Sequence, residues 1–172
     1  MASYSLTLAF AAFLLAGLAV KLWLATRQVR HVALHRDAVP LPFAATVPLH
    51  AHQKAADYTI TKTRFGLLEL ALGAAVLIGW TLLGGLDTLN QMLLRWLGSG
   101  MTQQLALMAG FALISGAIDL PLALDQTFVI EERFGFNKMT FRLWLVDLVK
   151  STLLGAAIGL PIVSRVFAYS SA

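Results

Sequence analysis

Four apolar stretches dominate this sequence and leave it few possible folds. They occupy about residues 4–24, 65–86, 103–130 and 143–167, with shorter polar segments between them. About 20 residues of helix, at ~1.5 Å rise per residue, cross a hydrocarbon core of ~30 Å. Only 13% of the residues are charged, whereas soluble domains have about 25%. The sequence therefore predicts an all-α polytopic membrane protein with four transmembrane helices.

The segments beside these spans predict further helix. No Lys or Arg precedes Lys21, so the first run lacks the basic start of a cleaved signal peptide and is expected to be retained. A helical pattern resumes at Leu49 and is expected to continue into the second span as a helical extension of the loop. Residues 89–97 are amphipathic and are expected to lie in the interface plane. Pro121 is expected to kink the third helix or to end its regular part. The glycines of the second span, Gly73 among them, are compatible with close helix packing.

The distribution of basic residues predicts the orientation in the membrane. Six lie in the loop after the first span, one follows the second span, and four lie around the loop after the third. In chain order these are Arg27, Arg30, Arg36, Lys54, Lys62 and Arg64, then Arg95, then Arg133, Lys138, Arg142 and Lys150. Cytoplasmic loops are enriched in Lys and Arg. Loops 25–64 and 131–142 are therefore predicted to be cytoplasmic, with both termini on the outer, periplasmic side of a bacterial inner membrane. An endoplasmic-reticulum membrane remains open, and the net charge of +4 does not indicate nucleic-acid binding.

Three carboxylates lie within or close to the apolar spans. Asp119 and Asp125 belong to the third span. A carboxylate at the bilayer centre costs about 2.5–3.5 kcal/mol on insertion scales, so such residues usually face protein or water. Asp119 and Asp125 are therefore candidates for the lining of an internal chamber. The alternatives are an interfacial position for Asp125 and a local hydrogen bond for Asp119. Glu69, one turn into the second span, is interpreted as an interfacial partner of Lys62 or Arg64.

The segment from Phe128 to Thr140 combines acids, bases, aromatics and turn-forming residues between two apolar spans. Adjacent glutamates on a helix point about 100° apart, so Glu131 and Glu132 are not expected to form a facing catalytic pair. Pairing with nearby bases such as Arg133, Lys138 or Arg142 is the preferred interpretation. Gly135 permits a turn, and Asn137 is expected to cap the helix that follows. The predicted structural and docking loop consists of Glu131, Glu132, Phe134, Gly135, Phe136, Asn137 and Lys138.

No motif in the chain makes a complete catalytic or metal site. His31 and His35 have the spacing of a His-Glu-x-x-His zinc helix, but Val32 stands where that motif has its glutamate. A solvated pair at headgroup level is the favoured interpretation. His50 and His52 give only weak evidence for metal, and the chain has no cysteine.

Several stretches resemble the Ste24-type CAAX prenyl proteases, which are integral-membrane zinc metalloproteases of the M48 class. The most specific runs from Phe128 to Thr140, followed by Leu143 to Ser151. The stretches from Arg27 to Pro40 and from His52 to Gly66 are similar to the family's first cytoplasmic loop and to the start of its second span. These matches follow the family's order over nearly the whole chain.

The resemblance implies that residues 1–172 are the N-terminal transmembrane domain of a zinc-dependent endopeptidase that acts on peptides or prenylated peptides. In that family the zinc ligands lie downstream of the fourth span, so no catalytic or metal residue is expected in this chain. Zinc is expected in the full-length enzyme, bound by a catalytic domain on the same or a separate chain. The implied role here is chamber wall and docking surface in the lipid bilayer, without peptidase activity of its own.

Two other functions remain open from the sequence. One is a stand-alone membrane scaffold or interaction protein. The other is a small transporter built around Asp119 and Asp125.

Overall fold

The computed structural model describes residues 2–170, and within that range it contains helices and no strand. The elements are α1 (Ala2–Leu34), the 3-10 helix η1 (Leu41–Phe43), α2 (Leu49–Thr81), α3 (Gly85–Leu97), α4 (Met101–Asp125), the π-helix η2 (Gln126–Glu131) and α5 (Phe141–Ser170). Counting α4 with η2, four helices are long and apolar enough to cross a membrane. The predicted all-α polytopic fold is therefore confirmed.

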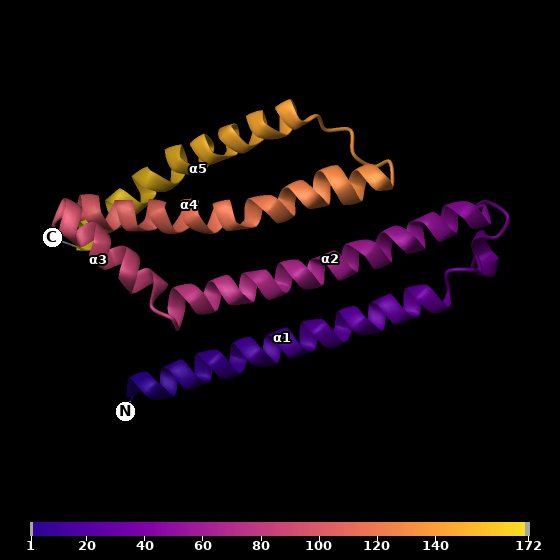
Figure 1. Ribbon diagram of the computed structural model, residues 1–172, viewed down its shortest axis with the longest axis horizontal. Helices are drawn as coiled ribbons and strands as arrows, with labels where there is room; N and C mark the ends of the chain where they lie inside the picture. Colours follow the sequence, from indigo (N-terminus) through magenta and orange to yellow (C-terminus); the bar gives the residue numbers. More distant parts are fainter. Residues whose placement is uncertain (1, 171–172) are drawn as a thin grey trace.

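The long helices form two antiparallel hairpins (Figure 1). α1 packs along α2, and α4 packs against α5. The connections within both hairpins, residues 35–48 and 132–140, lie at the same end of the molecule, which we call the basic end. The start of α1 and the end of α5 lie at the opposite end. This arrangement places the two most basic loops of the sequence together.

Two helices extend well beyond the apolar runs. α1 continues to Leu34, and α2 begins at Leu49, so the first loop is largely helical, as predicted. α2 ends at Thr81, five residues before the expected end at 86. The chain turns there through Gly84, which has φ +78°. A Cβ on Gly85 would lie 2.8 Å from the carbonyl oxygen of Gly79, so this corner leaves no space for a side chain.

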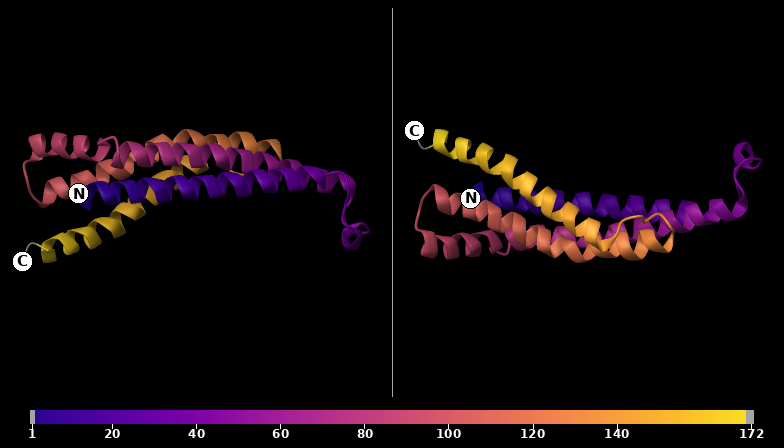
Figure 2. Two further views of the ribbon diagram at one scale, coloured as in Figure 1. Left: turned by 90° about the horizontal axis from the view of Figure 1, so that it is seen from below. Right: turned by 90° about the horizontal axis from the view of Figure 1, so that it is seen from above.

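The short helix α3 lies at the end of the molecule between the end of α2 and the start of α4 (Figure 1). It runs obliquely beside the first turns of α4 (Figure 2). Leu89 is buried and its side chain packs over Gly110, while the Gln103 amide donates a hydrogen bond to Asn90. These contacts hold α3 against its neighbour. With 13 residues it is about 20 Å long at 1.5 Å per residue, too short to cross the bilayer.

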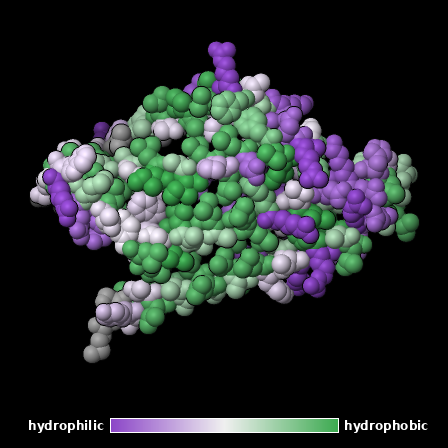
Figure 3. Space-filling view, in the orientation of Figure 1, coloured by the Kyte–Doolittle hydropathy of each residue, from purple (hydrophilic) through white to green (hydrophobic). Residues whose placement is uncertain are grey.

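Few of the described residues are buried, and they lie toward the two ends of the molecule. Ala56, Ile130 and Phe134 are buried at the basic end, and Leu89 and Gln103 are buried at the opposite end. On the face that Figure 3 shows, the surface between the two ends is predominantly hydrophobic, and hydrophilic side chains gather most densely at the basic end. Exposed apolar helix faces are what a lipid bilayer solvates, so this surface fits the four candidate spans.

Candidate functional site

The segment that the sequence singled out begins as a π-helix. α4 remains helical through Pro121 and passes at Gln126 into η2, which ends at Glu131. Single π-helical segments are rare in proteins, and those that occur are often found at functional sites. Ile130, within this segment, is buried.

Gly135 ends this helix with a two-bond capping motif. Its φ is +73°, in the left-handed region that favours glycine. The Phe136 amide donates to the Glu131 carbonyl and the Gly135 amide donates to the Glu132 carbonyl, both at 2.9 Å. This pair of bonds is a Schellman motif, which satisfies carbonyls that a helix end would otherwise leave free. The turn predicted at Gly135 is therefore present.

The turn brings two aromatic side chains onto α2. The ring of Tyr58 lies edge-on to Phe134, with centroids 5.3 Å apart, and to Phe136, with centroids 4.7 Å apart. Lys62 donates a hydrogen bond of 3.1 Å to the Tyr58 hydroxyl, and the Lys54 ammonium lies 5.7 Å from the centre of the Phe136 ring. We call these five residues the Tyr58 cluster. The cluster joins the second hairpin to the first at the basic end.

The polar residues of the loop differ in part from their predicted roles. Asn137 does not cap α5: its side-chain oxygen accepts from the Met139 amide at 2.7 Å, which forms an Asx turn. Thr140 is the cap, because its hydroxyl accepts from the Leu143 amide at 3.3 Å. The Asn137 side-chain amide donates to Glu132 at 3.0 Å. Within residues 2–170, neither Glu131 nor Glu132 forms an ion pair with a neighbouring base.

A shallow depression of about 580 Å³ opens beside this loop. Glu131 and Lys138 place opposite charges on its wall, and Trp144 contributes an aromatic surface. The remaining lining residues are Thr127, Phe136, Asn137, Met139 and Leu143. Four residues of the predicted docking loop thus share one concave surface.

A second contact at the basic end involves Arg36 and Asp57. The guanidinium donates from Nε and Nη2 to the two carboxylate oxygens of Asp57, at 2.7 and 2.9 Å, and from Nη1 to Asp37 at 2.9 Å. These bonds tie the connection after α1 to the polar first part of α2. The hydrogen bond from Arg36 and its charge lower the pKa of Asp57 below its usual value of 3.8, and the charge of Arg133 contributes further.

Because the pKa of Asp57 is lower in the folded state, its ion pair stabilises the protein above pH 3.8, and this contribution disappears as the pH falls through the lowered pKa. We therefore expect Asp57→Asn to lower the melting temperature at pH 7 and to have a smaller effect near pH 3. Circular dichroism melts of the purified protein in detergent at both pH values would measure this. Asp37→Asn is the control, since its carboxylate is 74% exposed. An equal effect of Asp57→Asn at both pH values would contradict this prediction.

Asp119 and Asp125, the two carboxylates of the third span, are exposed and both lie on α4. Trp80 donates to the Ser115 hydroxyl at 3.0 Å, which joins α2 to α4 far from the Tyr58 cluster. Asp119 lies one turn beyond Ser115, so both are on about the same face of α4. Asp125 lies at the last residue of α4, also exposed.

Glu69 is a third acid on this side of the molecule, and the sequence interpretation did not group it with Asp119 and Asp125. It lies eleven residues from Tyr58 and eleven from Trp80, and eleven residues make three turns to within about 20°. Glu69 is therefore on the same face of α2 as the two residues that contact the second hairpin. The signal was present in the spacing, but nothing in the sequence identified which α2 residues make that contact.

No described residues assemble a metal site. Groups of three or more His, Cys, Asp or Glu side chains in metal-binding positions are absent from residues 2–170. The His31 and His35 rings lie 4.3 Å apart, but His35 hydrogen-bonds the His31 carbonyl through Nδ1, and His52 hydrogen-bonds the His35 carbonyl through Nε2. Zinc therefore does not fit the part of the chain that the structure describes.

Comparison with known proteins places the chain in a family. A family model described as the CAAX prenyl protease N-terminal region, with five membrane helices, matches residues 28–171. The structure has five α-helices in its described part, the short α3 included. The crystal structure of S. mikatae Ste24p superposes with a TM-score of 0.80 at 27% sequence identity, over 88% of this chain and 36% of that chain.

Curated relatives carry the same family description. The human CAAX prenyl protease 1 homolog is 31% identical in an alignment of 169 positions that covers 90% of this chain and 34% of that protein. The probable CAAX prenyl protease 1 of Schizosaccharomyces pombe is 33% identical in an alignment of 158 positions that covers 84% of this chain and 33% of that protein. This chain thus spans about a third of their length. Both relatives are eukaryotic, so they lend no support to a bacterial origin. The chain belongs to the CAAX prenyl protease family and corresponds to the N-terminal membrane region of that family.

Proposed function

We propose that this chain is the membrane-embedded N-terminal part of a zinc-dependent endopeptidase of the CAAX prenyl protease type. Its two hairpins form part of a chamber wall, and its basic end is the docking surface for the catalytic part. Zinc and the catalytic residues belong to that other part, on the same or a separate chain. Peptides or prenylated peptides are the proposed substrates. The family match over residues 28–171, in a chain that spans a third of its relatives, supports this assignment.

The orientation follows from charge. The basic end carries the two connections with the most Lys and Arg, so it is proposed to face the cytoplasm, with both termini on the outer side. The depression between Glu131, Lys138 and Trp144 lies at this end. Its opposite charges and aromatic wall suit a polar protein segment, which supports docking of the catalytic part there.

The observation that carries the chamber proposal is the exposure of Asp119 near the middle of a membrane-spanning helix. Exposure of a carboxylate to hydrocarbon would cost about 2.5–3.5 kcal/mol, so water or protein must cover it. Ser115 faces α2, and Asp119 lies on about the same face of α4. Water that covers Asp119 would therefore lie on the inner side, between the two hairpins. Glu69 borders the same side from α2.

Single-cysteine labelling tests the chamber directly, because the chain has no cysteine of its own. In the intact membrane-embedded protein, Asp119→Cys and Glu69→Cys are expected to react with a charged methanethiosulfonate reagent at least about tenfold faster than a cysteine in lipid. The physical reason is that only a thiol in contact with water ionises to the reactive thiolate. Labelling rates would be followed by the mass shift of the protein.

Leu113→Cys is the matched control, on the same helix and 62% exposed. It lies six residues from Asp119, on a different side of α4. Equal, slow labelling of Asp119→Cys and Leu113→Cys would contradict a water-filled chamber. Fast labelling of both would also contradict it, because α4 would then lie in water on all sides.

A further inference from the structure

A groove runs between α1 and α2 and belongs to neither the docking loop nor the Tyr58 cluster. Its volume is about 600 Å³, within the ~300–1,000 Å³ typical of ligand sites. Its walls are apolar side chains and small residues, Phe13, Leu14, Gly17, Leu18, Leu70, Gly73 and Ala74 among them. A Cβ added to Gly17 or Gly73 would meet no atom within 4 Å. The glycines that suggested close helix packing therefore border open space.

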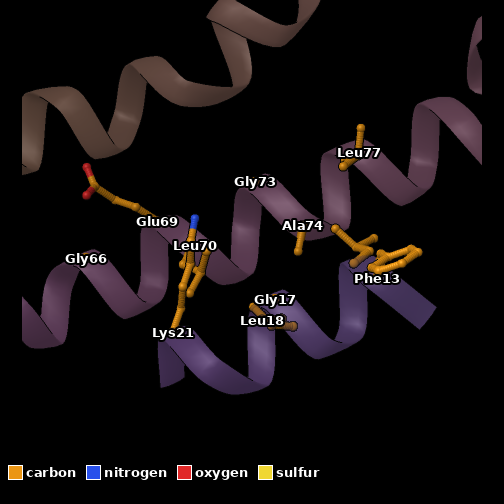
Figure 4. A pocket seen from close by; sticks show the side chains of 11 residues that line it. Phe13, Gly17, Leu18, Lys21, Gly66, Glu69, Leu70, Gly73, Ala74 and Leu77 are labelled. Atoms are coloured by element: carbon orange, nitrogen blue, oxygen red, sulfur yellow. The ribbon is translucent and has the colours of Figure 1, made fainter. Parts of the chain in front are cut away.

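One end of this groove carries a positive charge. Lys21 lines the groove, and its side chain rises from α1 toward α2 beside Leu70 (Figure 4). Lys21 has no hydrogen-bond or ion-pair partner in the part of the chain that the structure describes. Glu69 also borders the groove, but its carboxylate points away from α1. The charge presented to an occupant is therefore that of the lysine.

The depth of Lys21 matches the headgroup region of one leaflet. Two residues further along α1, Trp23 stacks with the Arg27 guanidinium, 4.9 Å from the ring centre. Tryptophan and arginine together mark a membrane–water interface. From Gly66 to Leu77 the groove extends over twelve residues of α2, a rise of about 17 Å, close to half of the ~30 Å hydrocarbon core.

We propose that this groove binds one anionic phospholipid of the leaflet on the basic side. The phosphate lies at Lys21, and one acyl chain follows the groove past Gly17 and Gly73 toward Phe13 and Leu77. The groove is long enough for an acyl chain and has apolar walls. At Gly17 and Gly73 no side chain blocks its path. The lysine at the headgroup end supplies the charge complementarity. This site is independent of the proposed protease function.

Native mass spectrometry of the intact protein, released from nanodiscs with equal amounts of phosphatidylglycerol and phosphatidylcholine, tests this proposal. The wild-type protein is expected to retain one phosphatidylglycerol about fivefold more often than one phosphatidylcholine, as expected for one basic residue at a lipid headgroup. In Lys21→Gln the ratio is expected to fall to about one, and in Lys21→Arg it should remain. Lys150→Gln, which removes a charge from α5, is the control and should keep the wild-type ratio.

Two variants fill the groove from opposite walls. Gly17→Leu and Gly73→Leu are each expected to lose most of the retained lipid with either headgroup, while Gly155→Leu, an open glycine of α5, should bind as wild type. Circular dichroism would verify that each variant keeps its helix content. An unchanged ratio in Lys21→Gln, or unchanged retention in both groove variants, would overturn the proposal. A dimer that is lost in both groove variants would also overturn it, because the groove would then hold a helix of a second copy.

Discussion

Phe134→Ala is expected to destabilise the protein by about 3 kcal/mol or more, since Phe→Ala substitutions at buried sites cost about 3–5 kcal/mol. Phe134 is only 7% exposed and packs edge-on against Tyr58. It lies at the basic end, outside the apolar spans, so its ring is transferred from water on folding. Its loss removes the centre of the contact between the two hairpins.

Equilibrium unfolding of the purified protein in mixed micelles, followed by circular dichroism, would measure this change. Phe136→Ala is the matched control, because Phe136 touches the same tyrosine but is 54% exposed. Its cost should be about half or less. Equal costs for the two variants would show that burial at position 134 is not what joins the hairpins.

Gly135→Val is expected to cost about 2 kcal/mol, within the ~1–3 kcal/mol of a non-glycine residue held at positive φ. The φ of +73° is fixed by the two capping bonds from Gly135 and Phe136. A β-branched residue resists this conformation most strongly. The strain would displace Phe134 and Phe136 from Tyr58.

Gly135→Asn provides the control, since asparagine tolerates the left-handed region. It should recover much of the stability that valine loses, in the same unfolding measurement. The nearest atom to a Cβ at this position is the Lys54 ammonium at 3.8 Å, so space does not limit either variant. Equal losses for valine and asparagine would mean that backbone conformation is not the cause.

Features set by local chemistry were predicted well. The four apolar runs predicted the spanning helices because helix length and hydropathy are properties of the segments themselves. The turn at Gly135 was predicted because glycine adopts positive φ readily, which is also a local property of the residue. The cap of α5 was assigned to Asn137 and proved to be Thr140, because either residue can start a helix and a helix boundary read from sequence is uncertain by about 2–4 residues.

The predictions that depended on contacts between helices did not name the contacting partners. The segment from 89 to 97 was expected in the interface plane, and the structure adds that Leu89 packs on Gly110 and holds α3 beside α4. Glu69 was interpreted as a partner of nearby bases, and its charge does act on Lys62. Its position between Tyr58 and Trp80 also places it on the face of α2 that contacts the second hairpin. An amphipathic face or a lone carboxylate specifies that a partner is needed, without specifying which partner.

The sequence by itself determined that this chain spans a membrane with four helices, which end of them is most basic, and which family it resembles. Each of these depends on residue type and on spacing along one segment. Only the tertiary structure decided that the Tyr58 ring contacts both Phe134 and Phe136. It also decided that Arg36 forms an ion pair with Asp57, and that a groove lies between α1 and α2 at Lys21. The physical reason is that these contacts join residues 21 to 78 positions apart, and the rotation of one helix against another sets them.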